Sequence, residues 1–155
     1  MSLPSESRDT LVTLYLGEAA AAEAYDRALT KKFAGQPEEP ILKQIKAEHR
    51  EAMGHLELEL KRHGIVAPEG PGAWGLAFHA IGTLSALVND EAPLQVLQHG
   101  EEVGIKEHER ALASGSFSPD VNERLREYRD RCERHHQLLQ RLRDVVTTQP
   151  NRPMI

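Results

Sequence analysis

Two glutamates occupy matching places in two similar segments of the chain. Glu18 lies in LGEAAAAEAY and Glu101 in HGEEVGIKEH, each directly after a glycine, and the segments align at an offset of 83 residues. Both glutamates also fall on the apolar stripe of their segments. Burying a lone carboxylate is costly, and two close carboxylates repel unless a cation or a shared proton lies between them. The pair therefore predicts either a site for a divalent cation, which carboxylate oxygens bind, or a polar core that satisfies both groups.

Long amphipathic helices are predicted to position these carboxylates. Apolar residues recur every three or four positions, which is the spacing of one helical face. Capping residues, proline at helix starts and glycine after helix ends mark the boundaries. The expected bounds are Ser7 or Asp9 to about Phe33–Gly35, Pro40 to Gly64, about Pro93 to Ala113, and Ser118 or Pro119 to about Val146.

Four such helices predict an all-α fold, a four-helix bundle, with no strand. We expect a single domain over 1–155, with its core at about 8–146 and a flexible tail at 147–155. A short extra helix is expected at about 74–88, in the crossover before the third long helix. The repeat around the two glutamates indicates two helix-hairpin halves, related by an approximate two-fold axis.

The chain resembles the ferritin-like superfamily over roughly residues 8–146. The resemblance lies in GEEVGIKEHERAL, in the Gly- and Pro-rich link before AWGLAFHAIGTLSALV, and in HHQLLQRLRD. More narrowly, the layout resembles a bacterial ferritin-like family of unknown function. In the di-iron members of the superfamily, two helices each supply one glutamate and the other two each supply Glu-x-x-His. The resemblance implies that Glu18 and Glu101 match the single glutamates.

The second helix departs from the motif that the resemblance implies. In AEHREAMGHL, the residue three positions after Glu48 is Glu51 rather than a histidine. His49 lies closest to the apolar stripe, Glu48 and His55 flank it, and Glu51 points further out. This helix is therefore expected to offer the Glu48 carboxylate and the His49 imidazole to the core.

The fourth helix matches the motif in letters only. Glu133 and His136 have the Glu-x-x-His spacing, but Glu133 follows the stripe residue Cys132. One residue corresponds to about 100° of helix rotation, which turns Glu133 away from the core. His135 lies nearer the centre of the stripe and His136 at its edge. The inward pair is therefore Cys132 and His135, with a thiol where the motif has a carboxylate.

The first functional hypothesis is a partial carboxylate and histidine site that binds iron or manganese for metal handling or redox chemistry. The centre would be mononuclear or an altered dinuclear one, because the full set of four carboxylates and two histidines is not present. The sequence identifies no catalytic residue and no organic cofactor. The predicted ligands are Glu18, Glu48, Glu101, His135 and His136, with His49 as a further histidine candidate.

The alternative is a metal-free, non-enzymatic bundle that acts through protein–protein interaction or as a homodimer. The apolar segment Trp74–Val88 could pack on a partner, or it could close one end of the bundle. In this hypothesis no metal is bound, and the two repeated glutamates accept hydrogen bonds inside a satisfied polar core. The expected donors are Tyr25, Arg131, His135 and His136.

Composition limits the partners that we expect. The 155 residues carry a formal net charge of -5 and only 5% aromatic residues, so no overall basic surface for nucleic acid is predicted. No apolar run is long enough for a membrane span, and the N-terminal residues lack the pattern of a signal peptide. One cysteine excludes an internal disulfide. We therefore expect a cytoplasmic protein.

Overall fold

Four long α-helices form a helical bundle in a computed structural model of the chain, which describes residues 3–69 and 91–148. No strand occurs within these two ranges. None of the helices in the described part of the chain is long and apolar enough to cross a membrane. The helices are α1 (Ser5–Ala28), α2 (Glu39–Arg62), α4 (Glu91–Ala113) and α5 (Pro119–Thr148).

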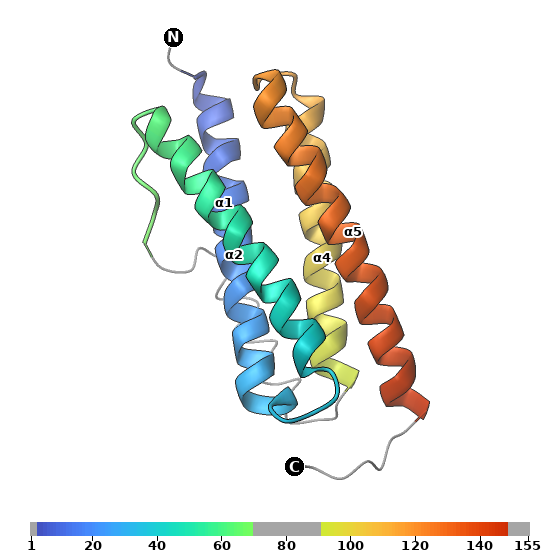
Figure 1. The fold of residues 1–155 in the computed structure, drawn as a ribbon. Coiled ribbons are helices and arrows are strands. Elements are labelled where there is room, and N and C mark those ends of the chain that lie inside the picture. Colours follow the sequence, from blue (N-terminus) through green and yellow to red (C-terminus); the bar gives the residue numbers. More distant parts are fainter. Residues whose placement is uncertain (1–2, 70–90, 149–155) are drawn as a thin grey trace.

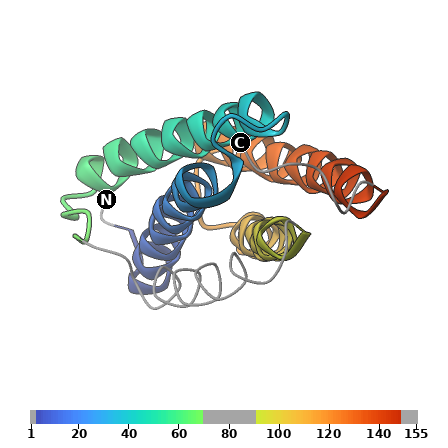
Figure 2. The same cartoon turned by 90° about the horizontal axis from the view of Figure 1, so that it is seen from below.

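The helices pack as two antiparallel pairs (Figure 1). α1 packs along α2, α4 packs along α5, and the pairs meet mainly through α1 and α4. Seen along the bundle, α1 and α4 lie on one side and α2 and α5 on the other (Figure 2). α2 ends and α4 begins at opposite ends of the bundle (Figure 1).

The helix boundaries follow the local signals closely. α1 begins at Ser5, slightly before the expected start, because Pro4 precedes it with an extended backbone and its carbonyl accepts the Arg8 N–H at 3.0 Å. After Ala28 the α-helix widens into one π-helical turn, η1 (Leu29–Phe33). Gly35 (φ 75°) and Gly64 (φ 71°) then turn the chain in the left-handed region, which suits glycine after helix ends.

The last helix is longer than its apolar pattern predicts. The Thr147 hydroxyl donates to the Arg143 carbonyl at 2.7 Å, and the Thr148 hydroxyl donates to the Val145 carbonyl at 2.9 Å. These bonds continue α5 two residues into the expected tail. The remainder of that tail and the expected helix at about 74–88 lie outside the described residues.

The core consists of two apolar clusters separated by a polar layer. One cluster includes Phe33, Leu42 and Leu139, near the turn between α1 and α2. The other includes Leu11 and Leu125, near the opposite end of the bundle. Between them lies a set of buried polar side chains. The apolar clusters therefore separate these polar groups from water at both ends.

Burial repeats along the chain at the same offset of 83 residues, and it does so in both helices of each pair. The sequence alone indicated a match only between the first helices. In α2 and α5 three of the five corresponding buried positions hold different side chains, so the pattern is clearer in burial than in residue type. The buried pairs are Leu42 and Leu125, Ile45 and Tyr128, His49 and Cys132, Ala52 and His135, and Leu56 and Leu139.

Candidate metal centre

The polar layer brings together carboxylate, imidazole and thiol groups from all four helices. Their positions on the helical stripes turn each of them toward the bundle axis. Every one is at most 4% exposed. They are Glu18 from α1, His49 from α2, Glu101 and His108 from α4, and Cys132 and His135 from α5.

One carboxylate oxygen, Oε1 of Glu101, is the meeting point of three side chains. His49 Nε2 lies 2.7 Å from it, and the Tyr25 hydroxyl donates to it at 2.7 Å. His135 Nδ1 lies 3.3 Å from the same oxygen. Residues from α1, α2 and α5 thus converge on one oxygen atom of α4.

The second nitrogen of each histidine faces another carboxylate. His49 Nδ1 lies 2.6 Å from Glu18 Oε2, and His135 Nε2 lies 2.5 Å from Glu48 Oε2. Arg134 holds the other oxygen of Glu48 at 3.3 Å. Carboxylates that hold the outer nitrogen of an imidazole are common around metal-binding histidines, because they fix the orientation of the ring.

Electrostatics define the metal-free state of the centre. Burial lowers the pKa of His49, but the carboxylates of Glu101 and Glu18 outweigh it and raise that pKa well above its usual value. Burial raises the pKa of Glu101, but the positive charge of His49 and contact with His135 outweigh it and lower that pKa far below its usual range. Without a metal, His49 is therefore an imidazolium that donates to both carboxylates.

The centre keeps buried polar atoms that no hydrogen bond satisfies. Glu101 Oε2 and His135 Nδ1 have no hydrogen-bond partner among the described residues. Nε2 of His135 donates to Glu48, so in a neutral ring Nδ1 directs a lone pair toward Glu101 Oε1. Two electron-rich atoms 3.3 Å apart repel unless a cation or a proton lies beside both. A metal ion or a proton on His135 Nδ1 satisfies this arrangement.

Within residues 3–69 and 91–148, two buried groups of side chains have the composition and spacing to hold a metal ion. The first is His49, Glu101 and His135, and the second is Glu18, His108 and Cys132. Within each group the ligand atoms all lie within 4.8 Å of one another. Glu18 belongs to the second group and also contacts His49 of the first, so the two groups are adjacent.

The thiol of Cys132 is protonated in the metal-free protein. Burial raises its pKa well above the usual value, and the negative charges of Glu101 and Glu18 raise it further. Cys132 is the free cysteine of the chain and is buried. A bound cation reverses this balance, because a thiol that coordinates a metal loses its proton.

A small cavity opens from the polar layer into the groove between α1 and α4. Its volume is about 50 Å³, room for a few water molecules. Small residues such as Gly17 and Ala21 line its mouth, and Glu18, His108 and Cys132 line its inner end. On the opposite side, around Glu48 and His135, the space left between side chains is too small for water.

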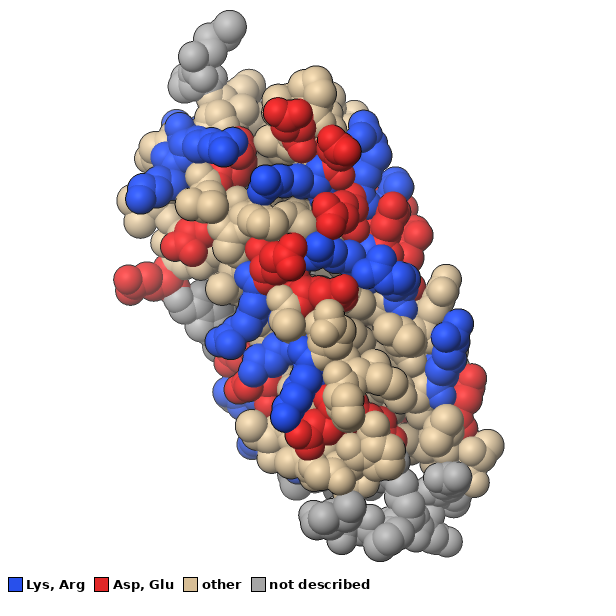
Figure 3. All heavy atoms as spheres, viewed as in Figure 1, with Lys and Arg blue, Asp and Glu red and all other residues tan. Residues whose placement is uncertain are grey.

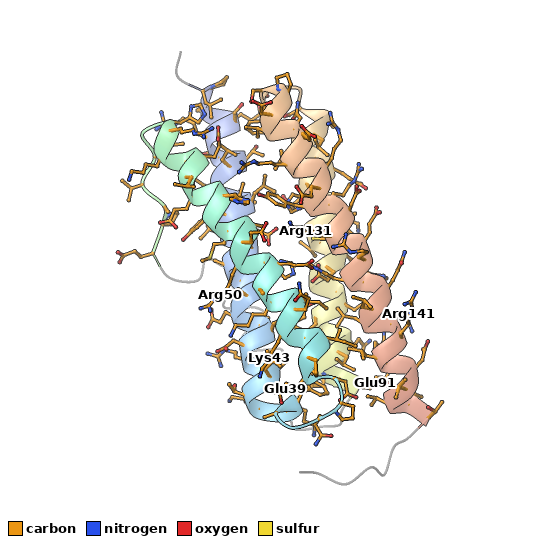
Figure 4. The ribbon with its side chains drawn as sticks, in the orientation of Figure 1. Glu39, Lys43, Arg50, Glu91, Arg131 and Arg141 are labelled. Atoms are coloured by element: carbon orange, nitrogen blue, oxygen red, sulfur yellow. The ribbon has the colours of Figure 1, made fainter. Side chains whose placement is uncertain are left out.

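Ion pairs close the seam between α2 and α5 on that opposite side. Figure 3 shows positive and negative side chains intermixed across this face. Arg131 lies between the two helices (Figure 4), and its Nη2 contacts Glu51 at 3.0 Å and Glu127 at 2.8 Å. Its guanidinium also lies 5.6 Å from the centre of the Tyr128 ring. Charged side chains therefore bridge the seam between α2 and α5.

The structure distributes the residues singled out from the sequence unevenly. Glu18, Glu101 and His135 lie together in the polar layer, and Glu48 lies at its edge on His135. His136 lies outside it, where its Nε2 contacts the exposed Glu102 at 3.0 Å. Helix rotation accounts for this difference, because His136 is one residue beyond the inward position.

The sequence contained too little indication that three further residues belong to the candidate site. His49 was only a further candidate ligand, yet it lies at the centre and contacts both repeated glutamates. Cys132 was placed on the inward stripe but was not proposed as a ligand, and neither was His108. A signal for His108 was present, because the residue at the matching position of the first repeat is Tyr25, which itself contacts Glu101.

Comparisons of this chain with protein-family models, with curated proteins and with solved structures found no match. The chemistry of the buried groups is therefore the basis for a functional assignment.

Proposed function

We propose that this protein binds a transition-metal ion, iron or manganese, between α1, α2, α4 and α5, in a ferritin-like bundle of two hairpin halves. The ligands are His49 Nε2, Glu101 Oε1 and His135 Nδ1, with Glu48 and Glu18 holding the outer nitrogens of the two histidines. The protein would use this site either to handle the metal ion or to carry out redox chemistry with it.

One observation carries this proposal. Two histidines from different helix pairs direct a nitrogen at the same buried carboxylate oxygen, at 2.7 Å for His49 and 3.3 Å for His135. The packing of an apolar core does not require polar atoms to converge in this way, and His135 Nδ1 has no hydrogen-bond partner. A cation bound to all three atoms removes both the repulsion and the unsatisfied group.

The donor set also indicates which ions fit. Two histidines with one carboxylate, and further positions open, form a ligand set typical of non-haem iron(II). Zinc accepts a similar set in its catalytic sites, so a zinc titration is a necessary comparison. The ferritin-like resemblance and the carboxylates around the site favour iron or manganese over zinc. The bound ion would supply reactivity with oxygen or peroxide, while the side chains position it and exclude bulk water.

The test measures metal binding directly. Metal-free protein is titrated anaerobically with Fe(II), and separately with Mn(II) and Zn(II), and bound metal is counted per chain by elemental analysis. We expect stoichiometric iron in the parent chain and its loss in His135→Ala. The matched control is the neighbouring substitution His136→Ala, which removes a histidine from the surface of the same helix turn and is expected to leave binding unchanged.

The alternative remains a metal-free bundle, and the bonds from His49 to both glutamates support it. If iron, manganese and zinc all fail to bind stoichiometrically to folded parent protein, the metal proposal is wrong. Equal loss of binding in His135→Ala and His136→Ala would also contradict it, because only His135 lies in the polar layer. Circular dichroism of each variant verifies that the helices are intact.

A further inference from the structure

His108 is oriented as a metal-binding histidine is. Its Nδ1 lies 2.7 Å from the Gly104 carbonyl, and since a carbonyl only accepts, Nδ1 must carry the hydrogen. In the neutral ring Nε2 then has a free lone pair. Nε2 is buried and has no hydrogen-bond partner. A backbone carbonyl that fixes the tautomer while the other nitrogen stays open is the arrangement found around metal-bound imidazoles.

The unpartnered nitrogen faces a carboxylate and a thiol. Glu18 Oε1 lies 3.5 Å from His108 Nε2, beyond an ordinary hydrogen bond. Cys132 Sγ completes a group whose ligand atoms all lie within 4.8 Å of one another. Tetrahedral ligands about 2.0–2.3 Å from a zinc ion lie roughly 3.3–3.8 Å apart, so shifts of about 1 Å suffice to close the group around an ion.

The backbone of α4 makes room for the thiol. A Cβ atom at Gly104 would lie 3.2 Å from Cys132 Sγ, which is closer than ordinary van der Waals contact. Glycine at this position therefore allows the sulfur to reach the polar layer between α4 and α5. The same residue supplies the carbonyl that orients His108. Gly104 thus supports two of the three ligands.

The two groups correspond through the repeat. At the offset of 83 residues, Glu18 matches Glu101 and Cys132 matches His49. Glu101 of the second helix pair meets His49 of the first pair, and Glu18 of the first pair lies close to Cys132 of the second. Each carboxylate therefore faces a potential ligand from the opposite pair. The potential ligand that faces Glu101 is a nitrogen of His49, and the one that faces Glu18 is the sulfur of Cys132.

We infer that Glu18, His108 and Cys132 form a second metal site, distinct from the site at His49, Glu101 and His135, which takes a thiophilic divalent ion such as Zn(II). Its three ligands provide oxygen, nitrogen and sulfur, and thiolate ligation favours such ions over Mn(II). On binding, the ion replaces the proton of the Cys132 thiol, and that proton leaves to solvent. The fourth position faces the cavity of about 50 Å³, where water or a small anion fits.

Cobalt is the probe that separates the two sites, because a thiolate ligand gives a near-ultraviolet charge-transfer band that nitrogen and oxygen ligands do not. Metal-free full-length protein is titrated with Co(II) under reducing, anaerobic conditions. We expect the band to develop to about one cobalt per chain. It should be absent in Cys132→Ser and strongly reduced in His108→Ala. It should persist in His135→Ala, because that residue belongs to the other site.

X-ray absorption on the Zn(II)-loaded parent chain tests the same inference without any substitution. One sulfur at about 2.3 Å is expected among nitrogen and oxygen ligands. If metal binds with only nitrogen and oxygen ligands and no charge-transfer band appears, this inference is overturned while the proposed function stands. If the cobalt band appears but Fe(II) binding is insensitive to His135→Ala, the thiolate site stands and the iron site does not.

Discussion

His49 Nε2 lies 2.7 Å from Glu101 Oε1, and this contact joins a residue of the first helix pair to a residue of the second at the centre of the bundle. The same imidazole reaches Glu18 through its other nitrogen at 2.6 Å. His49 is therefore the side chain that connects the two repeated glutamates. Its protonation governs both the stability of the metal-free protein and its capacity to bind an ion.

The stability of metal-free protein is expected to fall as the pH rises above about 6.5. The raised pKa of His49 stabilises the fold fully below its unfolded pKa of about 6.5, and this is lost as the pH rises through the folded pKa. The lowered pKa of Glu101 stabilises the fold fully above about 4.3, and this is lost as the pH falls through its folded pKa. Stability should therefore be highest between about pH 4.5 and 6.5.

Urea unfolding in the presence of a chelator measures this dependence. From pH 6.5 to 8 the free energy of unfolding should fall by up to about 1.4 kcal/mol per pH unit, the slope for one proton. In Glu101→Gln, His49 keeps only one carboxylate, so a flatter profile is expected. A parent protein more stable at pH 8 than at pH 6.5 would contradict the assignment of an imidazolium at His49.

Metal binding at the iron site is expected to release the His49 proton. An imidazolium cannot ligate, so the ion must displace the proton, and affinity should rise by up to about tenfold per pH unit at pH values below the raised pKa of His49. Measuring this in Cys132→Ser excludes the thiol proton of the second site. Calorimetry in two buffers of different ionisation enthalpy counts the released protons. An affinity independent of pH would show that His49 is not a ligand.

Gly104 and Gly54 form a matched pair for the role of the close approach at Cys132. Both are helical glycines, but a Cβ atom at Gly54 would meet nothing within 4 Å. Gly54→Ala is therefore expected to stabilise the protein by about 0.5–1 kcal/mol through helix propensity. Gly104→Ala should stabilise the protein clearly less than Gly54→Ala does, because the new methyl group displaces the sulfur of Cys132.

The same two variants also report on the thiolate site. The cobalt charge-transfer band should weaken in Gly104→Ala and stay unchanged in Gly54→Ala. Urea unfolding and the cobalt titration together separate loss of packing from loss of the site. Equal stabilisation and equal bands in both variants would mean that the contact between Gly104 and Cys132 has no influence.

Arg131 is expected to stabilise the seam between α2 and α5. Its guanidinium contacts Glu51 and Glu127 and lies over the Tyr128 ring, whereas Arg141 lies exposed further along α5 (Figure 4). Arg131→Ala should destabilise the protein by about 1 kcal/mol, a modest value because both glutamates are largely exposed. Arg141→Ala should stay within about 0.5 kcal/mol of the parent in urea unfolding.

Much of the candidate site was visible in helical periodicity. The inward position of His135 and the outward position of Glu133 follow from about 100° of rotation per residue, which a sequence specifies directly. The same rotation put His136 only at the edge of the stripe, where it was kept as a candidate ligand, so its place outside the cluster, on Glu102, was not predicted. The contact of His49 with both glutamates does not follow from rotation alone, because it depends on how far α2 is shifted along α1 and α4.

The sequence by itself determined the four helices, the stripe on each that faces inward, and the burial of Glu18 and Glu101. These features depend on contacts three or four residues apart, on capping residues and on glycine, all of which are local. Only the tertiary structure decided which nitrogen faces which carboxylate, and that His108 and Cys132 lie beside Glu18. Those distances depend on the relative rotation and axial shift of four packed helices, which arise from the packing of the whole core.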